Sequence, residues 1–295
     1  MRALTADTST GFGSTLAAAG RSILADARGA LANPKLSDGQ AVHEVRKAFK
    51  RWRALLRLLD GPLGARARPM RLQARTLMRA LTGARDAQSA LDALAGLRKA
   101  EAPLAAAVNN AIRQRLIGIR DAAEKKGLTK SMRQRLARYL DSATRAFGRW
   151  PIETIAFNAV ADAVTRTYRR TRRLLPDDWR DADTEHLHEL RRRVVEHRHH
   201  LDIIAGLRRP AAAREVQSLR NRLGACQDLA MLAELMAPHR PLARWRSRVT
   251  PAIEARRADH LKSAAKLGIR LFSEKPKAFR RRVGVLGAAR RKKKR

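Results

Sequence analysis

Cysteine is almost missing from this 295-residue sequence, in which Cys226 is the only one. The chain therefore cannot form an intramolecular disulfide, which fits a reducing compartment. No stretch approaches the roughly 20 apolar residues that a membrane-spanning helix needs, and the first 20 residues lack the apolar run of a signal peptide. We therefore expect a soluble, cytoplasmic protein without a transmembrane segment.

Acidic residues are also scarce. The sequence has 27 aspartates and glutamates against 64 lysines and arginines, a formal net charge of +37 at pH 7. Metal-assisted phosphoryl transfer normally needs carboxylates to hold its divalent ion. The sequence also contains no Walker loop, HExxH or GxSxG motif. We therefore expect no enzyme, no catalytic residues and no cofactor.

Apolar residues nevertheless make up 44% of the chain, too many for a disordered polycation. The charge therefore belongs to a folded protein. Its positive field would attract polyanions such as nucleic acid, an anionic membrane or a linear polyphosphate. Composition alone does not choose among them.

Helix formers dominate, whereas aromatics are only 4% of the residues. No convincing alternation of period two indicates strands, so we predict an all-α fold. Breaks at proline- and glycine-containing segments separate the predicted helices. These are 14–32, 38–60, 67–82, 85–100, 103–126, 129–147, 151–174, 184–205, 212–223, 228–237, 241–266 and 269–273.

Two pairs of segments indicate an internal duplication. VHEVRKAFKRWRALLRLL (42–59) aligns with LHELRRRVVEHRHHLDII (187–204), and LTGARD (81–86) aligns with LGACQD (223–228) at nearly the same offset. We therefore predict two pseudo-symmetric, four-helix-like bundles. The first repeat covers about 14–150 and the second about 151–275, and a flexible basic tail follows over 279–295.

Each of the two long segments separates into an apolar and a basic face when it is drawn as a helix. The first basic face carries His43, Arg46, Lys47, Lys50, Arg53 and Arg57. The second carries His188, Arg191, Arg192, Arg198 and His199. A solvated face usually mixes both signs, and neighbouring like charges repel, so we expect an anion to complete these faces. A row of cations about 27 Å long suits an extended polyanion better than one small phosphate.

These paired segments, with Asp86 and Asp228 closing the two LxxxxD motifs, resemble the CHAD family, the conserved histidine α-helical domain. The resemblance covers about 15–270, and we expect a stand-alone CHAD domain over 1–278. The CYTH domain that often precedes it in the family carries an ExExK signature, which is absent here. The resemblance implies basic helices that line a central groove and bind inorganic polyphosphate in it. It also implies that the protein is located on polyphosphate or storage granules.

By position, the resemblance implies that His43 and His188 are the namesake histidines. The implied polyphosphate contacts are Arg46, Lys47, Lys50, Arg53 and Arg57 in the first half and Arg191, Arg192 and Arg198 in the second. To these we add His199 and three further cations that would extend the groove, which are Arg75, Arg79 and Arg220.

Three positions weaken the second basic face. Its residues Val195, Glu196 and Asp202 stand where the first face has Lys50, Arg51 and Arg57. We therefore expect the two halves to contribute unequally to binding.

The histidines have two interpretations. His43 and His188 could donate to an anion, or they could stay neutral and fix a neighbouring helix, because nearby cations disfavour a protonated imidazole. His197 and His200 have a usable metal-ligand spacing. They lie near the apolar side of their helix, however, and have no counterpart in the first half, so we predict no metal site.

The two motif aspartates, Asp86 and Asp228, each begin a predicted helix. We therefore expect them to cap a helix or to pair with an arginine of the groove.

The sequence thus predicts non-catalytic binding of inorganic polyphosphate. A general polyanion or nucleic-acid-binding protein is the first alternative, and nucleic acid is a non-specific partner at low salt in either case. Two observations argue against the nucleic-acid alternative: aromatic residues for base stacking are few, and no helix-turn-helix pattern is evident. A granule-associated scaffold is the second alternative. The sequence leaves the oligomeric state open.

Overall fold

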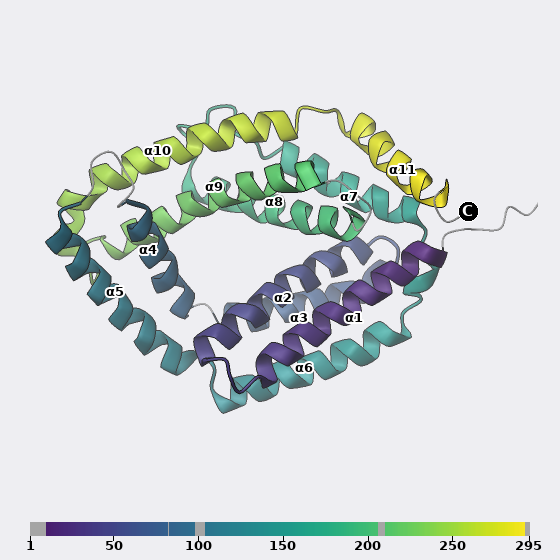
Figure 1. Ribbon diagram of the computed structural model, residues 1–295, viewed down its shortest axis with the longest axis horizontal. Coiled ribbons are helices and arrows are strands. Elements are labelled where there is room, and N and C mark those ends of the chain that lie inside the picture. Colours follow the sequence, from purple (N-terminus) through teal and green to yellow (C-terminus); the bar gives the residue numbers. More distant parts are fainter. Residues whose placement is uncertain (1–9, 82, 98–103, 206–209, 293–295) are drawn as a thin grey trace, which may run out of the picture.

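The residues that the structure describes, 10–81, 83–97, 104–205 and 210–292, form eleven α-helices and three short 3-10 helices, without a strand among them. Figure 1 shows this computed structural model. The predicted all-α class is confirmed. None of the described helices has the length and hydrophobicity that crossing a bilayer requires.

The helices follow one another along the chain with short connections. Up to residue 150 they are α1 (Thr10–Ala32), α2 (Asp38–Leu59), η1 (Gly64–Arg66), α3 (Ala67–Arg79), α4 (Gly83–Leu97), α5 (Ala106–Gly127) and α6 (Lys130–Arg149). Thereafter they are η2 (Ile152–Thr154), α7 (Phe157–Arg172), α8 (Thr184–Ala205), α9 (Pro210–Leu235), η3 (Ala243–Trp245), α10 (Arg246–Leu271) and α11 (Pro276–Lys292).

The helices surround a central pair, α2 and α8, which pack against each other. In Figure 1, α1, α3 and α6 lie with α2 in the lower half of the molecule, and α7, α9 and α10 lie with α8 in the upper half. Helices α4 and α5 form the left end, where α4 packs on α9 and α10. Helix α11 packs on α7 at the opposite end.

A capping box fixes the start of α2. The Ser37 hydroxyl accepts a hydrogen bond from the backbone N–H of Gln40, whose side chain accepts one from the backbone N–H of Ser37. Such a cap stabilises a helix by about 1 kcal/mol. The apolar face of α2 is buried, and the Trp52 indole donates to the Tyr139 hydroxyl of α6 at 2.8 Å. This burial fixes which face of α2 remains for the cations.

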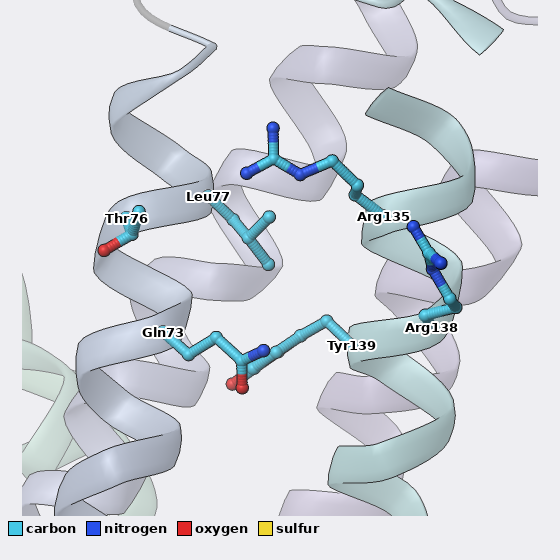
Figure 2. A pocket seen from close by; sticks show the side chains of 6 residues that line it. All are labelled: Gln73, Thr76, Leu77, Arg135, Arg138 and Tyr139. Atoms are coloured by element: carbon cyan, nitrogen blue, oxygen red, sulfur yellow. The ribbon is translucent and has the colours of Figure 1, made fainter. Parts of the chain in front are cut away.

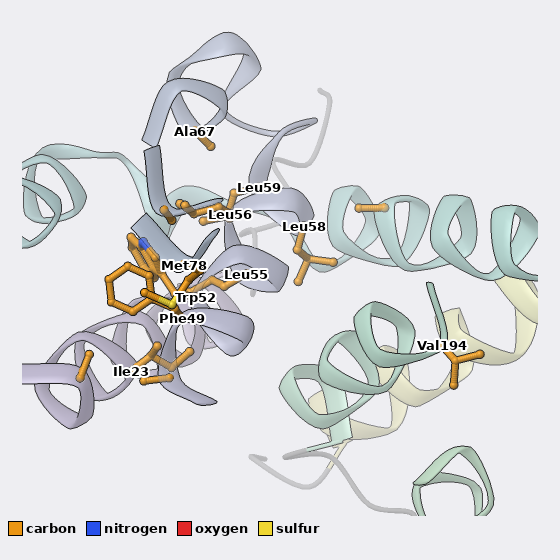
Figure 3. Close-up of a cluster of buried hydrophobic side chains, with 14 of the residues drawn as sticks. Ile23, Phe49, Trp52, Leu55, Leu56, Leu58, Leu59, Ala67, Met78 and Val194 are labelled. Atoms are coloured by element: carbon orange, nitrogen blue, oxygen red, sulfur yellow. The ribbon is translucent and has the colours of Figure 1, made fainter. Parts of the chain in front are cut away.

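The hydrophobic core forms two clusters. The larger one, part of which is drawn in Figure 3, contains Phe49, Trp52 and Met78 of the first half together with Val194 and Phe272 of the second. The smaller one joins side chains of α4 and α5 to side chains of α9 and α10. Both clusters therefore combine residues from before and after residue 150. The core does not divide at the predicted junction between repeats, and the duplication itself stays a prediction.

Two predicted helix breaks do not exist. The break predicted between 241–266 and 269–273 falls inside the single helix α10, which continues to Leu271. The segments 212–223 and 228–237, predicted as separate helices, belong to the single helix α9. Gly224 inside it is buried, and a Cβ at this position would lie 3.4 Å from Nε of Arg191 on α8. The glycine therefore marks a close approach of α9 to an arginine side chain. Asp228 accordingly lies inside a helix and not at its beginning.

The expected flexible tail over 279–295 is also different in the structure. Helix α11 extends to Lys292, and its Phe279 and Val283 are only 3% and 1% exposed. These two residues are four apart, so they share the face that packs on α7. Burial of this narrow apolar stripe explains why so basic a segment is helical. Residues 293–295 lie outside the described residues.

Candidate anion-binding site

Seven arginines gather where α2, α3 and α8 meet. We call them the central arginine cluster, and they are Arg53 and Arg57 of α2, Arg71, Arg75 and Arg79 of α3, and Arg192 and Arg193 of α8. Each lies close enough to another member for mutual electrostatic repulsion. The packing of the three helices thus concentrates positive charge that is far apart in the sequence.

Arg53 has four other arginines of the cluster as neighbours. Its side chain is partly buried, and Arg57, Arg71, Arg75 and Arg192 surround it. Burial first, and then these like charges, lower the pKa of its guanidinium to about 10. In the described part of the chain, no carboxylate forms an ion pair with it, and its buried Nε has no hydrogen-bond partner. The positive charge of Arg53 is therefore held without a counterion.

Three carboxylates, Asp60, Glu189 and Glu196, compensate the other members of the cluster in part. Arg57 pairs with Glu196 at 3.1 Å, and Arg71 pairs with Asp60 at 3.1 Å. Glu189 pairs with Arg192 at 2.9 Å and with Arg193 at 2.7 Å. These three carboxylates thus form ion pairs with four of the arginines, Arg57, Arg71, Arg192 and Arg193.

Glu196 connects the two halves of the chain. It lies on α8, pairs with Arg57 of α2, and also contacts Arg193 at 3.2 Å. One turn later, the His200 Nε2 group contacts the Ala54 carbonyl of α2 at 2.9 Å. From the sequence, Glu196 was expected only to weaken the second basic face. The structure shows that it also anchors α8 to α2.

His188 and Arg191 lie next to the cluster on α8, facing α9. Burial, followed by the charges of Arg192 and Arg191, lowers the pKa of His188, and a hydrogen bond with Gln227 opposes this shift. Arg191 donates to the Gln227 side chain at 2.8 Å. His188 is therefore neutral at pH 7 and acts as a hydrogen-bonding group. Gln227 is a neighbour that sequence reasoning missed.

Arg198, His199 and Arg220 gather near the C-terminal end of α8. Arg198 pairs with Asp202 at 3.4 Å, and the His199 Nδ1 atom lies 3.8 Å from the same carboxylate. Burial lowers the pKa of His199, and Arg198 and Arg220 lower it further, whereas Asp202 opposes them. Asp202, one of the three residues expected to weaken the second basic face, thus lies beside Arg198 and His199.

The N-terminal part of the first basic face is arranged differently. The Arg46 guanidinium donates to the Met78 carbonyl at 2.8 Å and to the Leu81 carbonyl at 3.0 Å, at the end of α3. Lys47 pairs with Glu44 at 2.8 Å and is the largest cause of the lowered pKa of that carboxyl. His43 is exposed, and Lys50 is partly buried. Arg46 thus stabilises a helix end, which its place in the sequence did not reveal.

Five of the fourteen predicted site residues therefore belong to the central arginine cluster, namely Arg53, Arg57, Arg75, Arg79 and Arg192. Sequence reasoning missed Arg71 and Arg193. The spacing of Arg71, Arg75 and Arg79, four residues apart each time, could have found the first. Nothing in the sequence pairs Arg193 with α2.

His197 and His200 are both buried in the core. The His197 ring packs among Tyr168, Phe272 and Phe279, and burial lowers its pKa to about 3. His200 contacts the Thr167 hydroxyl at 3.1 Å in addition to Ala54, and burial lowers its pKa to about 4. Among the described residues, no group of three or more potential ligands is placed to hold a metal ion.

Comparisons with known proteins agree with this architecture. The CHAD domain family model matches residues 15–237. PptA from Streptomyces chartreusis is similar in structure, with a TM-score of 0.63 and 17% identity over 88% of this chain and 97% of that one. The CHAD domain from the plant Ricinus communis has a TM-score of 0.58 and 18% identity over 91% and 95% of the two chains. At these identities the likeness concerns the fold alone. No curated protein is significantly similar to the chain.

Proposed function

The chain belongs to the CHAD domain family, which is linked with polyphosphate, and from this premise we propose that it binds inorganic polyphosphate through the central arginine cluster, without catalysis. The cluster provides planar guanidinium groups, which match phosphate oxygens with two parallel hydrogen bonds. A linear polyphosphate places a negative charge on every phosphate, so one chain can contact several arginines.

Arg53 is the observation that carries this proposal. A partly buried charge without a counterion costs free energy, and the four neighbouring arginines increase that cost. A bound phosphate would supply the missing negative charge and reduce the repulsion within the cluster. The site is therefore arranged for an anion that the protein itself does not provide.

The extent of the positive surface favours a polymer over a single phosphate. Arg53 and Arg75 come from the first half of the chain and Arg192 from the second, and all three lie in one cluster. Beyond the cluster, Arg198 of α8 and Arg220 of α9 lie together near His199. Contact of one extended anion with both groups of cations is part of this proposal.

The carboxylates of the cluster argue for binding without chemistry. Asp60, Glu189 and Glu196 each form at least one ion pair with an arginine. A divalent ion would have to displace these arginines to be held there. We therefore propose that the site binds the polymer and does not cleave it.

Binding of a long polyphosphate to the full chain tests the proposal. The Arg53→Gln/Arg75→Gln variant should bind at least tenfold more weakly, about 1.4 kcal/mol, because two charge-assisted contacts are removed. Arg21→Gln is a matched control for one charge, since Arg21 is exposed on α1, away from the cluster. Because the control removes one charge and the double variant two, a control loss equal to half of the double variant's loss in binding free energy would mean that net charge alone governs binding.

Competition with duplex DNA separates the proposal from general polyanion binding. Polyphosphate should displace DNA at equal charge concentration and should persist to higher salt, because exposed phosphate contacts weaken steeply as salt rises. If binding of both ligands is lost over the same range of salt concentration, the protein is a nucleic-acid or general polyanion binder.

We also place this function in the cytoplasm, on polyphosphate or storage granules. A tagged Arg53→Gln/Arg75→Gln variant should leave such granules. If it stays on them, the scaffold alternative is favoured.

A further inference from the structure

A second cationic pocket lies between α3 and α6, apart from the central arginine cluster. It has a volume of about 290 Å³ and is lined by Gln73, Thr76, Leu77, Arg135, Arg138 and Tyr139. Figure 2 shows Arg135 reaching from α6 toward α3 above Leu77, with Arg138 on the same helix. Because Arg135 and Arg138 are three residues apart, they lie on one face of α6.

No carboxylate compensates these two arginines. Both are exposed, and within the described residues neither forms an ion pair or a hydrogen bond with an acidic side chain. Helix α3 contains no acidic residue, and the single one of α6, Asp141, pairs with Arg28 of α1. Arg133, on the same helix, pairs instead with Asp38. Neither wall of the pocket therefore carries a negative charge.

The floor of the pocket is fixed and neutral. Leu77 and Tyr139 are buried, and the Tyr139 hydroxyl accepts from the Trp52 indole and donates to the Met70 carbonyl at 3.0 Å. Burial raises the pKa of Tyr139, so this hydroxyl stays protonated. The pocket is consequently formed without a ligand, and a ligand would meet an apolar floor below a pair of guanidinium groups.

Helix α3 separates this pocket from the central arginine cluster. Leu77 and Gln73 are each two residues from Arg75. At 100° per residue, both therefore lie about 160° around the helix from it. The two arginine groups therefore face opposite sides of α3. A ligand in the pocket does not occupy the position that Arg53 offers.

We propose that this pocket is a separate binding site for a small phosphorylated anion with one or two phosphoryl groups. Arg135 and Arg138 bind the phosphate oxygens, and the Gln73 amide donates from the opposite wall. The volume lies at the lower limit for small-molecule pockets and admits no long chain. The site does not depend on the polyphosphate proposal, because none of its residues belongs to the cluster.

Calorimetric titration of the full chain with pyrophosphate tests the proposal. Arg135→Gln/Arg138→Gln should weaken binding about tenfold, since each exposed charge contact contributes a factor of a few. Arg145→Gln removes one positive charge from an exposed position about 10 Å beyond Arg138 along α6, and it should leave the affinity within about twofold. Unchanged binding in the double variant, or an equal loss in Arg145→Gln, would overturn the site.

A second variant acts through the opposite wall. Gln73→Glu keeps the size of the side chain and places a carboxylate across from the two arginines. It should weaken pyrophosphate binding several-fold and raise the melting temperature slightly through a new ion pair. Full pyrophosphate affinity in Gln73→Glu would contradict the proposed position of the ligand.

Two further measurements separate this site from polyphosphate binding. Arg53→Gln should retain pyrophosphate binding in the pocket even if it loses the polymer. Pyrophosphate should also still bind when the protein is saturated with long polyphosphate. Displacement by the polymer would mean that the pocket is part of the polymer's path, and the proposal of a separate site would fail.

Discussion

His197 and His200 make the stability of the fold depend on pH. The folded protein keeps both neutral, with pKa values of about 3 and about 4 against an ordinary value of 6.5. The unfolded chain therefore takes up protons below pH 6.5, whereas the folded chain does not until the pH approaches 4. This contribution is fully present above pH 6.5 and is lost as the pH falls toward the folded pKa values. For His200 it amounts to roughly 3 kcal/mol.

The variant His200→Gln tests this dependence. It retains an amide donor for the Ala54 carbonyl of α2 but cannot take up a proton. Its free energy of unfolding in urea should fall less between pH 6.5 and 4 than that of the unchanged protein. An identical slope would show that carboxylates alone determine acid unfolding.

Arg46 and Arg53 show how far single residues can be assigned from the sequence. Both lie on the predicted basic face, seven residues apart, and both were expected to bind polyphosphate. In the structure, the Arg46 guanidinium binds the carbonyls at the end of α3, whereas the Arg53 guanidinium lies among arginines of α3 and α8. Helical spacing predicts the face of a residue. It does not predict which residues of other helices that face meets.

At the scale of helices, α11 is the element whose contribution to stability is easiest to measure. Phe279 stacks on Tyr168 with ring centroids 4.0 Å apart, so Phe279→Ala should lower the free energy of unfolding by about 3 kcal/mol or more. Val285→Ala is the control on the same helix, because Val285 is 62% exposed, and it should cost little. A loss below 1 kcal/mol for Phe279→Ala in urea unfolding would show that α11 is not part of the cooperative core.

Most helices could be predicted from the sequence because apolar spacing and proline breaks are local signals. The predicted range 184–205 is the observed α8, and 38–60 differs from α2 by one residue. The exceptions have physical reasons. The sequence predicts separate helices over 212–223 and 228–237, whereas Gly224 makes room for Arg191 within the continuous helix α9. The basic tail, whose apolar signal is short, was predicted to be flexible. It forms α11, in which Phe279 and Val283 are buried.

At the scale of the whole molecule, the sequence did not predict how the helices combine. The division into two similar bundles stays a prediction. Helix periodicity did not indicate that α4 and α5 share a core with α9 and α10, or that α2 packs on α8. These contacts join residues more than 100 positions apart, and periodicity within one helix carries no information about them. The central arginine cluster is a product of this long-range packing, which is why the sequence found its residues only in part.

The net charge of +37 predicts opposite effects of salt on the free and the bound protein. Repulsion between like charges destabilises the folded chain, so sodium chloride should raise the melting temperature of the free protein by screening. Exposed ion pairs such as Arg28–Asp141 weaken under the same conditions, but each contributes little. Repulsion therefore dominates because cations outnumber anions by more than two to one.

If polyphosphate binds the folded state as proposed, it should raise the melting temperature at low salt. That increase should shrink as salt weakens the phosphate contacts, so the melting temperatures of the free and bound protein should converge. Chloride is the appropriate anion, because sulfate stabilises proteins by exclusion and can itself bind arginines. A melting temperature of the free protein that falls with sodium chloride would mean that its ion pairs outweigh the repulsion.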